Sequence, residues 1–228
     1  TGTESLAATA TPGATINWYD AVTDTLMGTG SPWVTPVIDA TTTFNVAAEI
    51  PAIGSVIGAG ASNSSSLQSP FNHTWGGTKS QFLIRASELT AAGFAAGDIN
   101  TLGIMVVAAG IPYSEFNLNM GSTMDTALTT TFVTGLANVY YDPALTLSAG
   151  FYNFTLANAY NWDGASNVVI EFCWSNNNTG GTSAMVKVDA TPFVAESYFR
   201  VDNQAPAVLC ATATATGTYS YRPQFYLN

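Results

Sequence analysis

Short segments in which polar and apolar residues alternate recur along this chain, and turns rich in Gly, Pro and Asn separate them. Residues 113–120 alternate strictly, and residues 15–20 place Ile16 and Trp18 on one face. Side chains point alternately to the two faces of a β-strand, so each segment is expected to bury one face. Only residues 86–93 have the composition of a helix, long enough for one or two turns. The spacing of strands and turns predicts an all-β protein built from β-sandwiches.

The composition agrees with an extracellular β-protein and excludes two classes of partner. Charged residues make up 9% of the 228 residues, and 15 acidic residues face 5 basic ones, which gives a formal net charge of −10. Clustered Lys and Arg are needed to bind nucleic acids or anionic lipids, so neither is expected as a partner. No apolar run approaches the roughly 18 residues of a membrane helix, so no membrane insertion is expected.

Turn signals and composition divide the chain into two units. Residues 1–50 contain several short strands and predict a small sandwich. Residues 51–69 are mostly small and predict a linker that passes into the first strand of the second unit. Residues 70–228 predict about eight to ten strands and one short helix, which describes a larger, jelly-roll-like β-sandwich.

The first unit resembles a known repeat. The segment LAATATPGATINWYDAVTDTLMGTGSPWVTPVIDATTTFNVAAE is similar to the Ig-like repeat of very large secreted surface proteins of Bacteroidetes. The resemblance implies an Ig-like β-sandwich over residues 1–50. Complete repeats carry a further strand before the position of Thr1, so the first strand is expected to be missing. Either the chain is a piece of a longer protein, or another chain supplies that strand.

The second unit also resembles a Bacteroidetes surface module. Its markers are PFN-x-x-WGG-x-KSQF, ASEL-x-AAG, AGDI-x-x-LG, WDG-x-SNVV-x-EFC and Y-x-YRP, which occur between Pro70 and Pro223. Relatives of this kind lie beside Ig-like repeats in long proteins that leave the cell by type IX secretion. The resemblance implies an extracellular surface module and carries no established activity.

The two cysteines, Cys173 and Cys210, are 37 residues apart. An even number of cysteines in an extracellular chain predicts a disulfide, which would stabilise the fold by roughly 3–4 kcal/mol. The alternative is a pair of buried thiols that pack as small apolar groups.

Several aromatic residues stand next to amide side chains and could bind sugars. Trp75 and Trp162, with Tyr160 and Asn161, are candidates for a glycan platform, in which a ring stacks on the sugar and polar groups bind its hydroxyls. Most aromatic residues of a β-sandwich belong to the core, so a core position is the alternative for both tryptophans.

Oxygen-rich loops offer a possible calcium site. Asp163, Asn167, Asp202 and Asn203 are candidate ligands, because Ca²⁺ binds carboxylate and amide oxygens. A solvated acidic surface is the alternative, since the chain lacks a known calcium-loop motif.

The Bacteroidetes resemblance also implies sites of O-glycosylation. Bacteria of that group modify Thr or Ser after Asp when a small or apolar residue follows. Asp24-Thr25-Leu26 and Asp125-Thr126-Ala127 fit this pattern, so Thr25 and Thr126 are candidates.

We expect no enzymatic activity. The sole histidine, His73, lies in a turn without a nucleophile elbow, and Asp163 with Glu171 makes a weak pair for glycoside hydrolysis. The leading hypothesis is an extracellular structural or adhesive module of a large bacterial surface protein or fibre. It would contact copies of itself by strand addition at the incomplete Ig-like unit. The alternative is a carbohydrate-binding module for surface glycans, and Ca²⁺ is the one cofactor considered.

Overall fold

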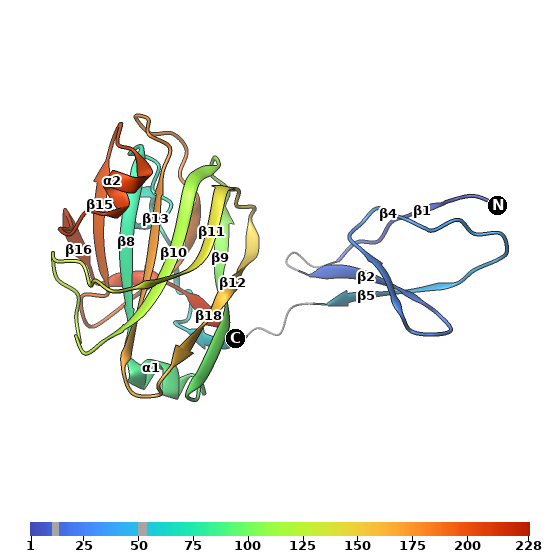
Figure 1. The fold of residues 1–228 in the computed structure, drawn as a ribbon, viewed down its shortest axis with the longest axis horizontal. Helices are drawn as coiled ribbons and strands as arrows, with labels where there is room; N and C mark the ends of the chain where they lie inside the picture. Colours follow the sequence, from blue (N-terminus) through green and yellow to red (C-terminus); the bar gives the residue numbers. More distant parts are fainter. Residues whose placement is uncertain (11–13, 50–53) are drawn as a thin grey trace. The chain divides into compact units, whose positions relative to one another are not determined.

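The computed structural model describes residues 1–10, 14–49 and 54–228. The chain forms two compact units, Thr1–Ile53 and Gly54–Asn228. Both are built from antiparallel β-strands, which confirms the predicted all-β class (Figure 1).

The first unit contains two small sheets. Their strands are β1 (Ser5–Leu6) paired with β4 (Trp33–Val34), and β3 (Leu26–Thr29), β2 (Thr15–Asp20) and β5 (Phe44–Glu49) in that order. Trp18 is buried, its ring stacks on Trp33 at 5.7 Å, and Trp33 meets the edge of Phe44 at 5.2 Å. Trp18 Nε1 also donates to the carbonyl of Gly30 at 2.8 Å, so the Trp18 ring is fixed on one face and at its edge.

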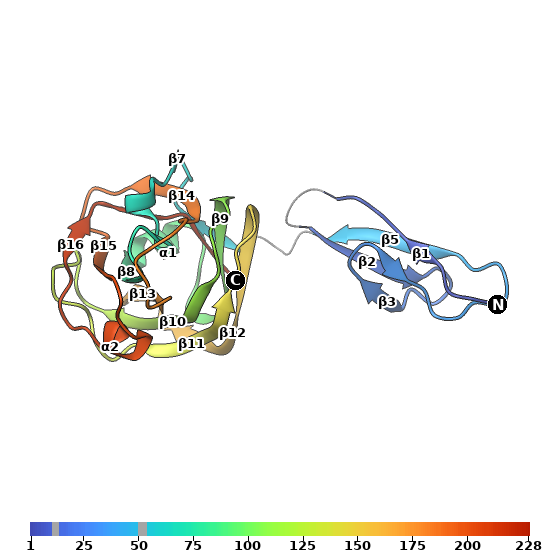
Figure 2. The same cartoon turned by 90° about the horizontal axis from the view of Figure 1, so that it is seen from above.

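The second unit is a sandwich of two large antiparallel sheets (Figure 2). The first sheet has the order β11 (Ala137–Leu145), β10 (Tyr113–Thr123), β13 (Asn167–Ser175), β8 (Gly77–Ile84), β15 (Glu196–Val201) and β16 (Gly217–Tyr219). The second has the order β17 (Tyr221–Pro223), β14 (Met185–Ala190), β9 (Gly97–Ala108), β18 (Phe225–Leu227) and β6 (Ser55–Ile57), with β12 (Gly150–Trp162) on β9 and β7 (Ser62–Asn63) on β14.

A continuous apolar core fills the sandwich, and aromatic rings dominate it. Phe116 stacks on Phe154 at 5.5 Å, and Phe172 contacts both of these rings and Phe225. The predicted alternation of residues 113–120 holds from Phe116 onward. It breaks at Glu115, where a φ of 55° turns the backbone, so that Tyr113 is buried on the same side as Phe116.

Helical structure is confined to short pieces. The helix expected within residues 86–93 is α1 (Ala86–Ala91), which lies at one end of the sandwich (Figure 1). A second helix, α2 (Pro206–Cys210), was not expected, because five residues are too few to show helical periodicity. Among the helices of the described ranges, none is long and apolar enough to cross a membrane.

Most of the range 51–69 belongs to the second unit. Residues 55–57 form β6, which pairs with β18, residues 62–63 form β7, which pairs with β14, and a 3₁₀ turn, η1, covers Ser66–Gln68. The first strand expected at the end of the linker is therefore β6, and residues 51–53 of the expected linker lie outside the described residues.

Candidate functional site

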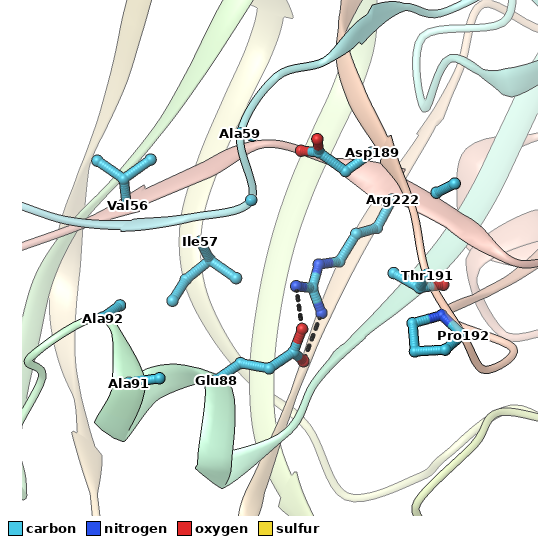
Figure 3. A pocket seen from close by; sticks show the side chains of 12 residues that line it. Val56, Ile57, Ala59, Glu88, Ala91, Ala92, Asp189, Thr191, Pro192 and Arg222 are labelled. Carbon is cyan, nitrogen blue, oxygen red and sulfur yellow. Dashed lines mark hydrogen bonds and ion pairs between the residues drawn. The ribbon is translucent and has the colours of Figure 1, made fainter.

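A pocket of about 460 Å³ lies beside α1 in the second unit. Three segments enclose it: the loop that follows β6, helix α1, and the end of β14 with its neighbour β17 (Figure 3). Small apolar side chains make much of the wall, including Ile57, Ala91 and Pro192. The charged groups are Glu88, Asp189 and Arg222.

An ion pair between Glu88 and Arg222 crosses this pocket. Arg222 Nη2 donates to Glu88 Oε1 at 2.6 Å, and Nη1 donates to Glu88 Oε2 and to the carbonyl of Leu83, both at 2.8 Å. Burial raises the pKa of Glu88, but the hydrogen bonds and the charge of Arg222 outweigh it, so the net pKa is lowered. The two side chains thus hold each other as a planar, charged pair (Figure 3).

The second carboxylate of the pocket, Asp189, is held by the backbone. Its Oδ2 accepts from the N–H of Gly60 at 3.0 Å, and its Oδ1 accepts from the N–H of Ala61 at 3.1 Å. Gly58 has a φ of 94°, and a Cβ there would lie 2.2 Å from Asp189 Oδ2. The loop can therefore wrap around the carboxylate only with glycine at position 58.

A second polar group, the Lys79–Glu171 cluster, lies on the outer face of the first sheet. Lys79 Nζ donates to the carbonyls of Cys210 at 2.8 Å and Thr212 at 3.0 Å, and lies 3.4 Å from Glu171 Oε2. Glu171 also accepts from Gln81 at 2.7 Å and from Asn119 at 2.8 Å. Both charged side chains are buried. Through the carbonyls of Cys210 and Thr212, the cluster joins the end of α2 and the residues after it to strands β8 and β13.

The predicted disulfide is present next to the Lys79–Glu171 cluster. Cys173 of β13 is bonded to Cys210 at the end of α2, and neither cysteine is free. Cys210 also supplies one of the carbonyls that Lys79 binds. The covalent bond and the cluster therefore fasten the same segment to the central strands.

The structure does not assemble the predicted glycan platform. Trp162 is 1% exposed, and its Nε1 donates to the carbonyl of Ser166, so its assignment to the platform is wrong. Tyr160 is half-buried against the core, whereas Asn161 is exposed and donates to Asp98. Trp75 is 42% exposed.

The tryptophans are also far apart. Trp75 precedes Gly77, which pairs with Ser175 at the end of β13, whereas Trp162 binds Ser166, just before the start of that strand. Nine residues of strand separate the two ends, or roughly 25 Å at the usual rise. One sugar ring cannot contact both.

The same geometry separates the predicted calcium ligands. Asp163 and Asn167 lie at the start of β13, while Asp202 and Asn203 follow β15, whose last residue is level with the end of β13. The four residues therefore do not form one site. Within the described part of the chain, no three His, Cys, Asp or Glu side chains gather in a way that could hold a metal ion.

The remaining predicted residues lie in turns. Thr25 and Thr126 are both exposed, and the carbonyl of Thr126 accepts from the Arg85 guanidinium. His73 is fully buried, with its Nε2 at 3.2 Å from Asn178 Oδ1, and burial lowers its pKa. A buried neutral ring is a structural element of the turn, and O-glycosylation of the two threonines stays a prediction.

Sequence reasoning did not single out the residues of the pocket. Glu88, Asp189 and Arg222 are far apart in the chain and follow no catalytic or metal-binding pattern. Two of them nevertheless stand in the motifs ASEL and YRP, which belong to the resemblance of the second unit. Those motifs meet in space as an ion pair.

A buried carboxyl group outside the pocket gives the fold a pH dependence. Glu196 is fully buried; its Oε1 accepts from Ser80 at 3.1 Å, and Arg200 lies 3.9 Å away. Burial raises the pKa of Glu196 to about 8, although Arg200 and Ser80 act in the opposite direction. The folded state therefore holds a proton that the unfolded chain releases above its ordinary pKa of 4.5.

This difference predicts that the free energy of unfolding falls as the pH rises from about 4.5 to 8, by up to about 1.4 kcal/mol per pH unit. Glu196→Gln should flatten that dependence, because the amide does not titrate. Urea unfolding at several pH values measures it, with the exposed Glu115→Gln as the control. An unchanged slope in the Glu196 variant would contradict the assignment.

None of the family models, curated proteins or solved structures compared with this chain matches it. Its function is therefore inferred from the contacts of its own residues. Among the described residues, those contacts offer a charged pocket beside α1, an exposed tryptophan and outer segments that are fixed to the first sheet.

Proposed function

We propose that this chain is a non-enzymatic structural or adhesive module of a large extracellular protein. The motif resemblance to Bacteroidetes surface proteins, with type IX secretion as the route, supports this proposal. The disulfide is compatible with an extracellular location, because such bonds persist in oxidising compartments. The observation that carries the proposal is that a disulfide, an ionic cluster and hydrogen bonds fix the outer segments of the second unit to its first sheet.

Two independent sets of bonds, the disulfide and the Lys79–Glu171 cluster, hold the segments on the outer face of the first sheet in place. The disulfide ties α2 to the central strand β13, and the Lys79–Glu171 cluster ties the segment after α2 to β8 and β13. Gln81 adds two hydrogen bonds to Val133, which hold the loop before β11. Loops fixed in this way suit a module that has to persist outside the cell, where proteases attack mobile segments.

Adhesion through copies of the chain is the proposed mode of contact. In the first unit, β3 and β5 are the outer strands of the three-stranded sheet, and Val46 of β5 is 50% exposed. An outer strand with an exposed apolar side chain can accept a strand from another chain. Self-association would then run through β5.

The proposal predicts that the chain forms dimers or larger species at high concentration. Val46→Lys should shift them towards monomer, because a charged residue on an outer strand opposes pairing. Sedimentation velocity measures the shift, and beads coated with each variant test adhesion under flow to a surface coated with the chain. Val208→Lys, on the exposed side of α2, is the matched control. A chain that stays monomeric at millimolar concentration would rule out strand addition.

Glycan binding is the second candidate, and the exposure of Trp75 favours it. Gly76 donates to Asp202 at 2.8 Å and accepts from the N–H of Asn176 at 2.8 Å, so the turn that carries Trp75 is fixed. A fixed, exposed indole can stack on a sugar ring. Binding on a glycan array that is lost in Trp75→Ala and kept in Tyr141→Ala would establish this function.

A further inference from the structure

We propose that the pocket beside α1 binds a primary alkylammonium group, such as the side chain of a lysine. The pocket combines a wall of small apolar side chains with two ordered carboxylates, those of Glu88 and Asp189 (Figure 3). An alkyl chain would contact the wall, and the ammonium would bind the carboxylate oxygens. The site is independent of the adhesive function proposed above.

Most of the side-chain donors that line this pocket are already used, whereas its carboxylates keep free acceptor positions. Both Nη atoms of Arg222 already donate to Glu88 or Leu83, and the Thr191 hydroxyl donates to Phe193 at 2.6 Å. Arg222 Nε is buried and has no hydrogen-bond partner among the described residues. The carboxylates keep unused lone pairs, since Asp189 accepts one backbone N–H on each oxygen. A ligand rich in donors satisfies them.

The charges favour a cation over a neutral ligand. The Glu88–Arg222 pair is neutral as a unit, so Asp189 leaves the pocket with a formal charge of −1. Four of the five basic side chains are held by contacts within the chain, those of Lys79, Arg85, Arg200 and Arg222. The chain as a whole carries a net charge of −10, so its long-range field attracts cations.

The geometry favours an ammonium over a guanidinium or a sugar. A guanidinium prefers the two-oxygen edge of a carboxylate, and Arg222 already occupies that edge of Glu88. An ammonium is a compact charge that can bind a single carboxylate oxygen, such as one of Asp189. A sugar ring would gain little here, because none of the described residues that line the pocket is aromatic.

Titration of the ¹⁵N-labelled full chain with 1,5-diaminopentane and, separately, with Nα-acetyl-lysine amide tests this assignment. Saturable shifts of the Gly60 and Ala61 amides are expected, because both donate to Asp189. Tighter binding of the lysine amide identifies a protein side chain as the source, and tighter binding of the diamine identifies a free polyamine. 1-Pentanol, which lacks the charge, should not bind.

Two variants remove the site by different means. Asp189→Asn keeps an acceptor oxygen but loses the charge and should weaken binding at least fivefold, whereas the exposed Asp98→Asn should leave it unchanged. Ala91→Leu fills the pocket without altering its charges and should abolish binding, with an unchanged amide spectrum elsewhere as the check on folding. Absence of saturable binding to the native chain, or equal weakening in the Asp189 and Asp98 variants, would overturn the assignment.

Discussion

Replacement of Lys79 by Met is expected to lower the free energy of unfolding by about 3–5 kcal/mol. The substitution leaves the Glu171 carboxylate buried without its cation, and it removes the donor that the carbonyls of Cys210 and Thr212 share. Loss of one partner from a buried ion pair costs far more than the pair itself contributes, because the remaining charge stays desolvated. Urea unfolding at pH 7 measures the difference.

The double variant Lys79→Met, Glu171→Met separates this cause from general damage. It removes both charges together and should recover a large part of the lost stability, since apolar pairs replace buried ion pairs at little cost. Lys187→Met, on β14 and in no ion pair among the described residues, should change the stability by less than about 1 kcal/mol. A Lys79 variant as stable as the Lys187 variant would show that the cluster does not brace the fold.

Removal of the disulfide is expected to cost roughly 3–4 kcal/mol, as a loop of 37 residues implies. In Cys173→Ala, Cys210→Ala, α2 loses its covalent bond to β13 and is held by the cluster and by packing of Leu209. Thermal unfolding with and without reductant measures the effect. The chain has no other cysteine, so the double variant should be insensitive to reductant. Equal midpoints for the native chain in both conditions would contradict the prediction.

The all-β architecture followed from local patterns, because strand alternation depends on neighbours two residues apart. The pattern of residues 113–120 located β10 correctly and failed only at Glu115. There a positive φ, rather than side-chain polarity, determines which face of the strand the neighbouring side chains point to. Trp162 shows the complementary error. Its polar neighbours Asn161 and Asp163 suggest an exposed ring, but the ring packs inward beside Phe94.

The candidate site could not be predicted in the same way, because its residues meet through pairings between distant strands. Glu88 and Arg222 are 134 positions apart, and Lys79 and Cys210 are 131 apart. The motifs that carry the resemblance of the second unit nevertheless contain these groups: KSQ holds Lys79 and Gln81, and EFC holds Glu171 and Cys173. Such motifs mark buried charges and the disulfide rather than a reacting centre.

The pairing of β6 with β18 determines how the second unit responds to tension. Ser55 at the start of β6 lies opposite Leu227 at the end of β18, so the two ends of the unit leave from neighbouring positions. A pulling force applied through residues 54 and 228 would load these strands one hydrogen bond at a time instead of shearing the whole ladder. Under load, β6 and β18 would therefore detach from the sandwich first, while β13 and α2, which the disulfide joins, stay folded.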